Sequence, residues 1–190
     1  GDHSSPIWPD YWFYHNTVLR TDNAWRGYYG HGIGGRGVRG NRRALLNNCF
    51  VQLRGVPGLS FAPTPANYQI DGNLHWGLVD GPAFEGDFFK KQSRKYAFRK
   101  QPLPKDWMQH DVFSDPRFKK LTPDPNANVD VTLQKGSAAK DAGVAIPSEW
   151  PDPLRTKDEG KPDLGALPAG TQPWRVGVRG RLSLFDNPTQ

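Results

Sequence analysis

The sequence predicts an all-β protein, a parallel β-helix of few coils with a C-terminal cap, long loops and almost no helix. Its 190 residues include 21 Gly and 18 Pro. Gly supplies turns with positive φ, and Pro interrupts helices and central strands, so long helices are excluded. The core must come from short segments, for which 10 Phe, 7 Trp and 6 Tyr supply large apolar side chains. A weak internal repeat indicates how these segments are arranged.

The repeat appears when the chain is aligned on Asn16, Asn48 and Asn73, taken as position zero. Position −3 then holds Phe13, Leu45 and Ile70, position +1 holds Thr17, Cys49 and Leu74, and position +3 holds Leu19, Val51 and Trp76. Columns that stay apolar or compact are typical of stacked strands, because like side chains pile up into one interior. We therefore expect these three columns to be interior, with Cys49 as a small core residue.

Each of the three asparagines is expected at a bend between two short strands. Asparagine can hydrogen-bond the backbone of its neighbours, and it tolerates positive φ better than other residues that have a side chain. Stacked asparagines can also bond to one another in a ladder.

The repeat and the composition divide the chain into three parts. Residues 1–106 are predicted to be coils with inserted loops, residues 107–168 a closing coil and C-terminal cap, and residues 169–190 a tail with one further strand, Trp174–Phe185. A cap is needed because the end of a stack of coils would otherwise expose its apolar interior.

Local signals fill in the predicted cap. Alternation predicts a strand over Val129–Leu133. Ser137 can cap a single helical turn, and Gly143 can end that turn with positive φ. Asp141 and Asp163 are short acceptors suited to fixing loops.

Two motifs of this cap carry a family resemblance. Gly136-Ser-Ala-Ala-Lys-Asp-Ala-Gly143 and Pro162-Asp-Leu-Gly-Ala166 follow the turn Asp115-Pro-Arg-Phe118, and His15-Asn-Thr17 and Asn47-Asn-Cys-Phe50 stand earlier. In this order they resemble the C-terminal end of bacterial right-handed β-helix proteins of the pectate-lyase-like superfamily, over roughly residues 12–168. Ala138 and Lys140 depart from that pattern. The resemblance implies right-handed coils and a secreted, carbohydrate-active protein.

The charge balance bears on partners. Lys and Arg outnumber Asp and Glu by 25 to 19, a modest excess that favours anionic partners such as acidic polysaccharide and also serves plain solubility. No apolar run is long enough to span a membrane. The opening Gly-Asp-His-Ser-Ser-Pro is typical of a mature or cleaved N-terminus, so the absence of a leader does not favour the cytoplasm. The family resemblance implies a secreted, periplasmic or cell-surface protein. Because no cap precedes Trp12, we also expect further coils on another chain or a removed segment.

Polar residues in the variable columns are the candidate site residues. The alignment places Tyr14, His15, Asp71 and His75 in these columns, which we expect to face outward. β-Elimination on a uronate needs a base and a cation for the carboxylate. His15 or Tyr14 is the candidate base, and Arg42 is the candidate cation that completes the catalytic set. The expected substrate-binding residues are His31, Arg36, Arg39, Arg43, Asp71 and His75.

Other activities stay open or are disfavoured. A glycoside hydrolase would need two carboxylates, for which Asp71 has Asp80, Glu85 and Asp87 as partners, without a pair singled out by spacing. A non-catalytic surface or envelope scaffold that assembles with another chain is the second class of function, since the basic loops at 26–43 and 89–105 suit it equally.

Cofactor and nucleotide signals are weak. Asp124-Pro-Asn-Ala-Asn-Val-Asp130 offers oxygen ligands for Ca²⁺ but lacks the Gly and Glu of a dedicated loop, so we expect a solvated turn and no cofactor. The Gly-His-Gly-Ile-Gly-Gly run at 30–35 is not followed by a helix, which disfavours a dinucleotide site. Nucleic acid is disfavoured as a partner of the same Arg/Gly stretch.

Overall fold

The computed structural model describes residues 10–20, 42–53, 68–78, 105–124 and 126–173. The described strands are β1 (Tyr11–Tyr14), β2 (Thr17–Arg20), β3 (Arg43–Leu46), β4 (Cys49–Gln52), β5 (Tyr68–Asp71), β6 (Leu74–Gly77), β7 (Phe118–Lys120) and β8 (Asp130–Leu133). Within these ranges the only helical element is a short 3₁₀ turn, η1 (Arg155–Lys157). The described part of the chain is therefore all-β, as predicted.

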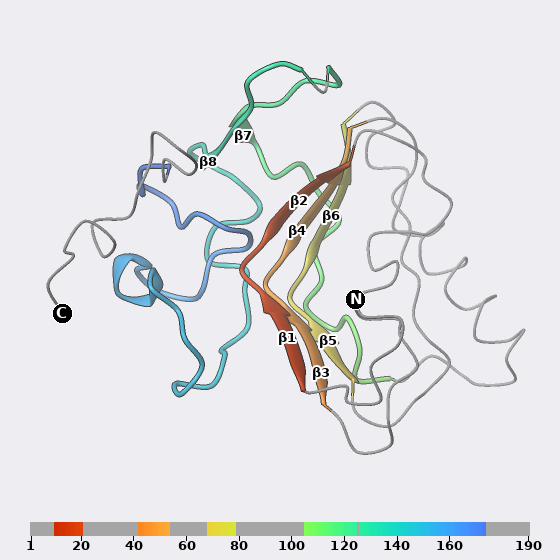
Figure 1. Ribbon diagram of the computed structural model, residues 1–190, viewed down its shortest axis with the longest axis vertical. Helices are drawn as coiled ribbons and strands as arrows, with labels where there is room; N and C mark the ends of the chain where they lie inside the picture. Colours follow the sequence, from red (N-terminus) through yellow and green to blue (C-terminus); the bar gives the residue numbers. More distant parts are fainter. Residues whose placement is uncertain (1–9, 21–41, 54–67, 79–104, 125, 174–190) are drawn as a thin grey trace, which may run out of the picture.

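The first six strands form two parallel sheets, ordered β1-β3-β5 and β2-β4-β6. Each odd strand bends directly into the next even strand, which gives three strand–bend–strand units lying side by side (Figure 1). Cα partners are Phe13, Leu45 and Ile70 in one sheet, and Thr17, Cys49 and Leu74, then Leu19, Val51 and Trp76, in the other. These are the predicted columns, so the strand register is confirmed.

The bend itself corrects one expectation. Positive φ belongs to the residue before each asparagine: His15 (49°), Asn47 (57°) and Gly72 (62°). Asparagine and glycine adopt this conformation most readily, and His15 adopts it in the first unit. The asparagines at position zero, for which we expected that positive φ would be tolerated, do not adopt it. They have another role.

That role is a hydrogen-bonded ladder. Asn48 Oδ1 accepts from Asn16 N (3.0 Å) and Asn16 Nδ2 (3.1 Å), and Asn73 Oδ1 accepts from Asn48 N (3.1 Å) and Asn48 Nδ2 (2.9 Å). Asn48 and Asn73 are fully buried. Since a buried amide without partners is costly, each asparagine holds the next unit in register.

The stacking continues beyond the three repeats that the alignment found. Asp111 takes the place of the fourth asparagine, with Oδ1 accepting from Asn73 N at 2.8 Å. Val112 forms a parallel bridge with Leu74, and Phe113 stacks on His75 with ring centroids 5.1 Å apart. Alignment on asparagine missed this segment because the side chain at position zero is a carboxylate.

The apolar columns lie on two faces of the sheets instead of in one interior. Phe13, Phe50, His75 and Phe113 form a row of stacked rings, with centroids 5.1–6.4 Å apart. Because side chains alternate along a strand, Cys49 and Val51 lie on the other face from Phe50. The expectation that position +1 and +3 side chains share an interior with Phe13 is therefore wrong.

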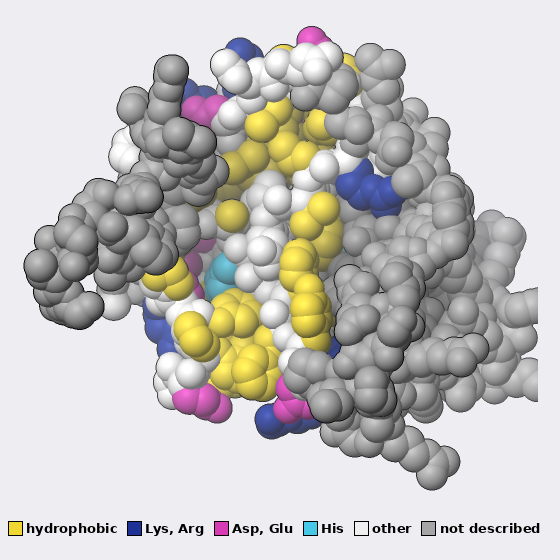
Figure 2. Space-filling model, in the orientation of Figure 1, with side chains coloured by type: hydrophobic (Ala, Val, Ile, Leu, Met, Phe, Trp, Pro, Cys, Tyr) yellow, Lys and Arg dark blue, Asp and Glu magenta, His cyan; other side chains and the backbone are white. Residues whose placement is uncertain are grey.

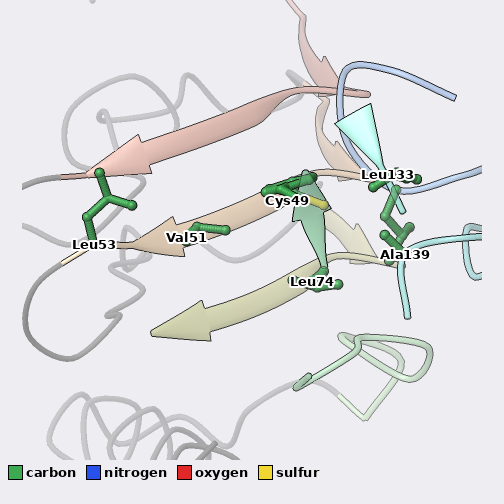
Figure 3. Packing of buried hydrophobic residues seen from close by; sticks show 8 residues of the cluster. Cys49, Val51, Leu53, Leu74, Leu133 and Ala139 are labelled. Carbon is green, nitrogen blue, oxygen red and sulfur yellow. The ribbon is translucent and has the colours of Figure 1, made fainter. Parts of the chain in front are cut away.

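That second face is covered by the C-terminal residues. Cys49, Val51, Leu53 and Leu74 form one buried cluster with Phe118, Leu133, Ala139 and Leu164 (Figure 3). Figure 1 shows the chain from β8 to residue 173 on the outer side of the bend between the two sheets. Burial of each such Leu or Phe stabilises the fold by roughly 1.5–3 kcal/mol, so the sheets and this segment depend on each other.

The first part of the C-terminal segment is a hairpin and a tight turn. β7 pairs antiparallel with β8, so the strand expected at Val129–Leu133 is confirmed. Ser137 Oγ bonds Pro116 O and accepts from Ala139 N, as a capping residue does, but the segment that follows is a turn.

Gly143 does not end that turn with positive φ, since this conformation falls on Asp141 (54°). Glycine is required at 143 by close packing: a Cβ there would lie 2.6 Å from Pro162 O and 2.9 Å from Asn47 Oδ1.

The two C-terminal motifs bind each other and the sheets. Leu164 N donates to Ala139 O, and Asp163 Oδ1 accepts from Asp141 N, which confirms Asp163 as a loop-fixing acceptor. Asn47 Nδ2 donates to Val144 O and Asn47 Oδ1 accepts from Val144 N, both at 2.8 Å. The Asn47 amide thus fixes the C-terminal segment to the bend of the second unit.

We predict that Asn48→Ala lowers the free energy of unfolding by at least about 2 kcal/mol, because it removes the four hydrogen bonds of the Asn48 side chain and leaves Asn16 N and Phe13 O without these partners. Denaturant unfolding measures the change. Asn128→Ala, at an exposed position, is the matched control and should be nearly neutral. Similar losses in the two variants would contradict a structural role for the ladder.

We predict that Gly165→Ala destabilises the fold by at least about 2 kcal/mol more than Gly170→Ala. Both glycines have positive φ (96° and 82°), which costs an alanine roughly 1–2 kcal/mol. Only at 165 would the added Cβ lie 2.7 Å from Thr17 Oγ1, whereas at 170 nothing lies within 4 Å. Thermal unfolding of the pair isolates the packing contribution, and equal melting temperatures would refute it.

Candidate functional site

A hollow of about 640 Å³ lies between β1 and the C-terminal segment, and we call it the β1 pocket. Trp12, Tyr14 and His15 line one side, and Pro151–Leu154, Asp158 and Gly165–Pro168 line the other. Trp150 stacks on Trp12 (ring centroids 4.8 Å apart) and contacts Tyr14 (5.3 Å). Figure 2 shows apolar side chains gathered in the lower part of this view, where β1 lies in Figure 1.

His15 reaches this pocket because its backbone turns at the bend. Its side chain is 16% exposed, and Nε2 lies 3.4 Å from Asn47 Nδ2 and 3.9 Å from Asp152 Oδ2. Burial lowers the pKa of His15 below its ordinary value, an effect that the charges of Asp152 and Asp158 partly oppose. The imidazole is therefore neutral near pH 7 and can accept or donate a hydrogen bond.

Two carboxylates accompany His15. Asp152 and Asp158 line the β1 pocket and also a second hollow of about 320 Å³ beside it, to which Arg155 contributes. Burial raises the pKa of Asp158, with repulsion from Asp163 and Asp141 adding to it and a hydrogen bond from Asp163 N opposing it. Arg155 is held by the carbonyls of Pro147, Ser148 and Trp150.

Tyr14 lies at the pocket but is unsuited to act as a base. Its hydroxyl donates to Pro151 O at 2.5 Å. Burial, followed by the charge of Asp152, raises the pKa of Tyr14 above its usual value of 10. The phenol is therefore protonated and fixes the Pro151 backbone against β1.

The two described arginines of the candidate set have different environments. Arg42 is 70% exposed, pairs with Asp10 (Nη2 to Oδ2, 2.9 Å) and lies over the Trp12 ring at 5.8 Å from its centroid. Arg43 is buried, and its Nη1 donates to Arg42 O. Only Arg42 is therefore accessible to a ligand at the edge of the pocket.

Asp71 and His75 lie away from the β1 pocket. Asp71 pairs with His110, with Oδ2 2.7 Å from Nδ1 and Oδ1 accepting from the His110 backbone. His75 pairs with Asp111 at 2.7 Å, and both side chains are fully buried. The expectation that His75 faces outward is wrong, because its ring is itself part of the row of stacked rings, between Phe50 and Phe113.

Several predicted positions lie outside the described residues. These are His31, Arg36, Arg39 and the Gly-rich run at 30–35, the carboxylates Asp80, Glu85 and Asp87, and the expected strand Trp174–Phe185. Within the described ranges, no three His, Cys, Asp or Glu side chains gather as a metal-ligand set. The segment 124–130 uses Asp124 and Asp130 to accept from the backbone N–H of Asn126 and Thr132.

Sequence reasoning missed Trp150, Asp152 and Asp158. They come from a Pro-rich stretch without strand periodicity, so no column alignment could bring them to β1. A signal was present in Trp150-Pro-Asp152, an aromatic and an acid in a loop far from the other polar candidates.

The arrangement is better suited to binding than to proton abstraction. The aromatic side chains offer a flat surface for the apolar face of a ligand, and neutral His15 and the two aspartates are able to accept hydrogen bonds from hydroxyl groups. Cys49 is fully buried and burial raises the pKa of its thiol, so it is not a nucleophile. None of the described helical segments is long and apolar enough to cross a membrane.

We predict that the stability of the fold falls as the pH is lowered from about 6.5, with His15 responsible for part of the loss. The unfolded chain takes up the proton near its ordinary pKa, whereas folded His15 takes it up only at lower pH. His15→Asn keeps a residue that tolerates positive φ and removes the titrating imidazole, so it should reduce this loss of stability. Denaturant unfolding between pH 8 and 5 measures it, and parallel curves for both proteins would contradict the assignment.

A comparison of this chain with protein-family models, curated proteins and solved structures found no match.

Proposed function

We propose that this chain is part of a secreted or cell-surface right-handed parallel β-helix protein that binds an acidic polysaccharide at the β1 pocket. The β-helix proposal is supported by two parallel sheets with one shared register and by a ladder of side chains at the bends. Repetition of this kind is typical of solenoids, in which each unit contacts only its neighbours.

Trp12 carries the binding proposal. Its side chain lines the β1 pocket, is 38% exposed and contacts both Trp150 and Arg42. A sugar ring stacked on the exposed part of Trp12 would have its apolar face against the indole and its hydroxyl groups toward His15 and the aspartates.

Arg42 supplies the preference for an acidic chain. Its ion pair with Asp10 is solvent-exposed and therefore adds little to stability. A uronate carboxylate could replace Asp10 and pair with both arms of the guanidinium. Arg42 lies over the same indole, so one uronate residue could contact both side chains.

Binding is proposed ahead of cleavage. β-Elimination needs a base near the sugar ring. Of the two candidate bases, Tyr14 is held protonated by its bond to Pro151, which leaves only the largely buried, neutral His15. The second candidate, a scaffold that assembles with another chain, is favoured by one observation. β1 and β2 are partly exposed, whereas β3 and β4 are fully buried.

We predict that Trp12→Ala weakens binding to uronic-acid polysaccharides at least tenfold, measured by affinity electrophoresis or calorimetry. Tyr11→Ala is the matched control: it is equally exposed (37%) and lies on the same strand, but it points to the opposite face. It should leave affinity unchanged. No binding to any polysaccharide, or equal losses in both variants, would refute the proposal.

We predict that Arg42→Ala weakens binding to acidic polysaccharides several-fold and leaves binding to neutral ones unchanged. Lys120→Ala, an exposed cation on β7, controls for net charge. The ultraviolet absorbance of unsaturated product, followed in the same mixtures, distinguishes binding from elimination. Equal effects of Arg42→Ala and Lys120→Ala would indicate attraction by net charge alone.

A further inference from the structure

The asparagine ladder has a direction. At every step the side-chain oxygen of one unit accepts a backbone N–H and a side-chain N–H from the unit before it. Among the described units, no side-chain oxygen of the ladder accepts from the unit after it. Asn48 Nδ2 and Asn73 Nδ2 also donate to backbone carbonyls of the unit before, Phe13 O and Leu45 O. The direction of the ladder therefore lies in the side-chain oxygen, which faces the unit before it.

The C-terminal end of the ladder is closed. Asp111 Oδ1 accepts from Asn73 N and Nδ2, at 2.8 and 3.5 Å, and Oδ2 pairs with His75 at 2.7 Å. A carboxylate has no N–H to offer to a further unit. The aspartate therefore ends the row that the asparagines begin.

The N-terminal end of the ladder is open. Asn16 Nδ2 donates to Asn48 Oδ1 and to Tyr14 O, but Asn16 Oδ1 accepts no hydrogen bond from any described residue. β1 and β2 likewise pair on one side only within the described chain. The columns that are buried in β3 and β4 are partly exposed here, at Phe13, Val18 and Leu19.

We propose that the β1–β2 edge binds one further strand–bend–strand segment, from outside the described residues, which carries an asparagine at its bend. That asparagine would donate its backbone N–H and Nδ2 to Asn16 Oδ1, and the strands would pair in parallel with β1 and β2. The proposal continues the stacking already present between the three units, and it does not depend on polysaccharide binding.

The donor requirement disfavours a second copy of this chain stacked head to tail. In that arrangement Asp111 of one copy would meet Asn16 of the next. The Asp111 backbone N–H could donate to Asn16 Oδ1, but its carboxylate, unlike an asparagine amide, has no side-chain N–H to add. The matching partner is therefore a different segment, with an amide at the bend and apolar side chains at positions −3 and +2.

The test uses the full chain extended at its N-terminus by a copy of residues 42–53, joined through a flexible Gly/Ser linker. The linker supplies the high effective concentration that a short segment needs. The matched control is the same extension with aspartate in place of the asparagine that copies Asn48, since aspartate cannot donate. Thermal unfolding and amide hydrogen exchange at Tyr11–Tyr14 and Thr17–Arg20 are the measurements.

We expect the asparagine extension to raise the melting temperature by roughly 2–8 °C over the aspartate extension, and to slow amide exchange in β1 and β2. Identical melting and exchange in the two extended proteins would overturn the proposal. Concentration-dependent self-association of the unextended chain, measured by sedimentation, would also overturn it, because the edge would then accept a second copy.

Discussion

The structure depends on buried amide side chains at the bends between its paired strands. Asn48 and Asn73 have no access to water, so each polar group they carry needs a partner within the protein. The stack supplies those partners only when neighbouring units are in one register, because a shift would separate the side chains of adjacent bends. The ladder therefore sets the strand register of both parallel sheets at once. Asp111 ends the ladder, because its carboxylate accepts hydrogen bonds and donates none.

In the second unit the residue before the stacking asparagine is also an asparagine, Asn47, and its side chain holds the C-terminal segment against the sheets. Asn47 adopts positive φ, which directs its side chain toward the outer face, where it binds Val144 through both amide groups. Gly143 and Gly165 allow the C-terminal segment to approach closely enough for these contacts. Two adjacent asparagines thus have opposite roles: one stacks units, and the other holds the segment that covers them.

The candidate site follows from this attachment. The β1 pocket has one wall from the first unit and one from residues more than a hundred positions later, so it exists only because the C-terminal segment is fixed to the sheets. His15 occupies the bend position that Asn47 occupies in the second unit, and it contacts Asp152 of that segment instead of a backbone carbonyl of Val144. The first unit thus differs from the second at the point where the pocket opens.

The sequence by itself determined the all-β class, the register of six strands and the presence of the ladder, because these follow from which residues recur at fixed offsets. It placed Asp163 as a loop-fixing residue for the same local reason. Only the tertiary structure decided which face each column occupies, since the positive φ before each asparagine reverses the alternation across the bend.

Tertiary contacts also decided the environments of the polar candidates. His75 is buried against Asp111 and Arg43 is buried beside Arg42, whereas His15 lies with Asp152 and Asp158, which the chain supplies from a distant Pro-rich stretch. A polar side chain in a variable column of the repeat does not by itself show that the side chain is exposed to water. Whether such a side chain meets water or a buried partner depends on the segment that packs over it, and that packing is set by contacts between residues far apart in the chain.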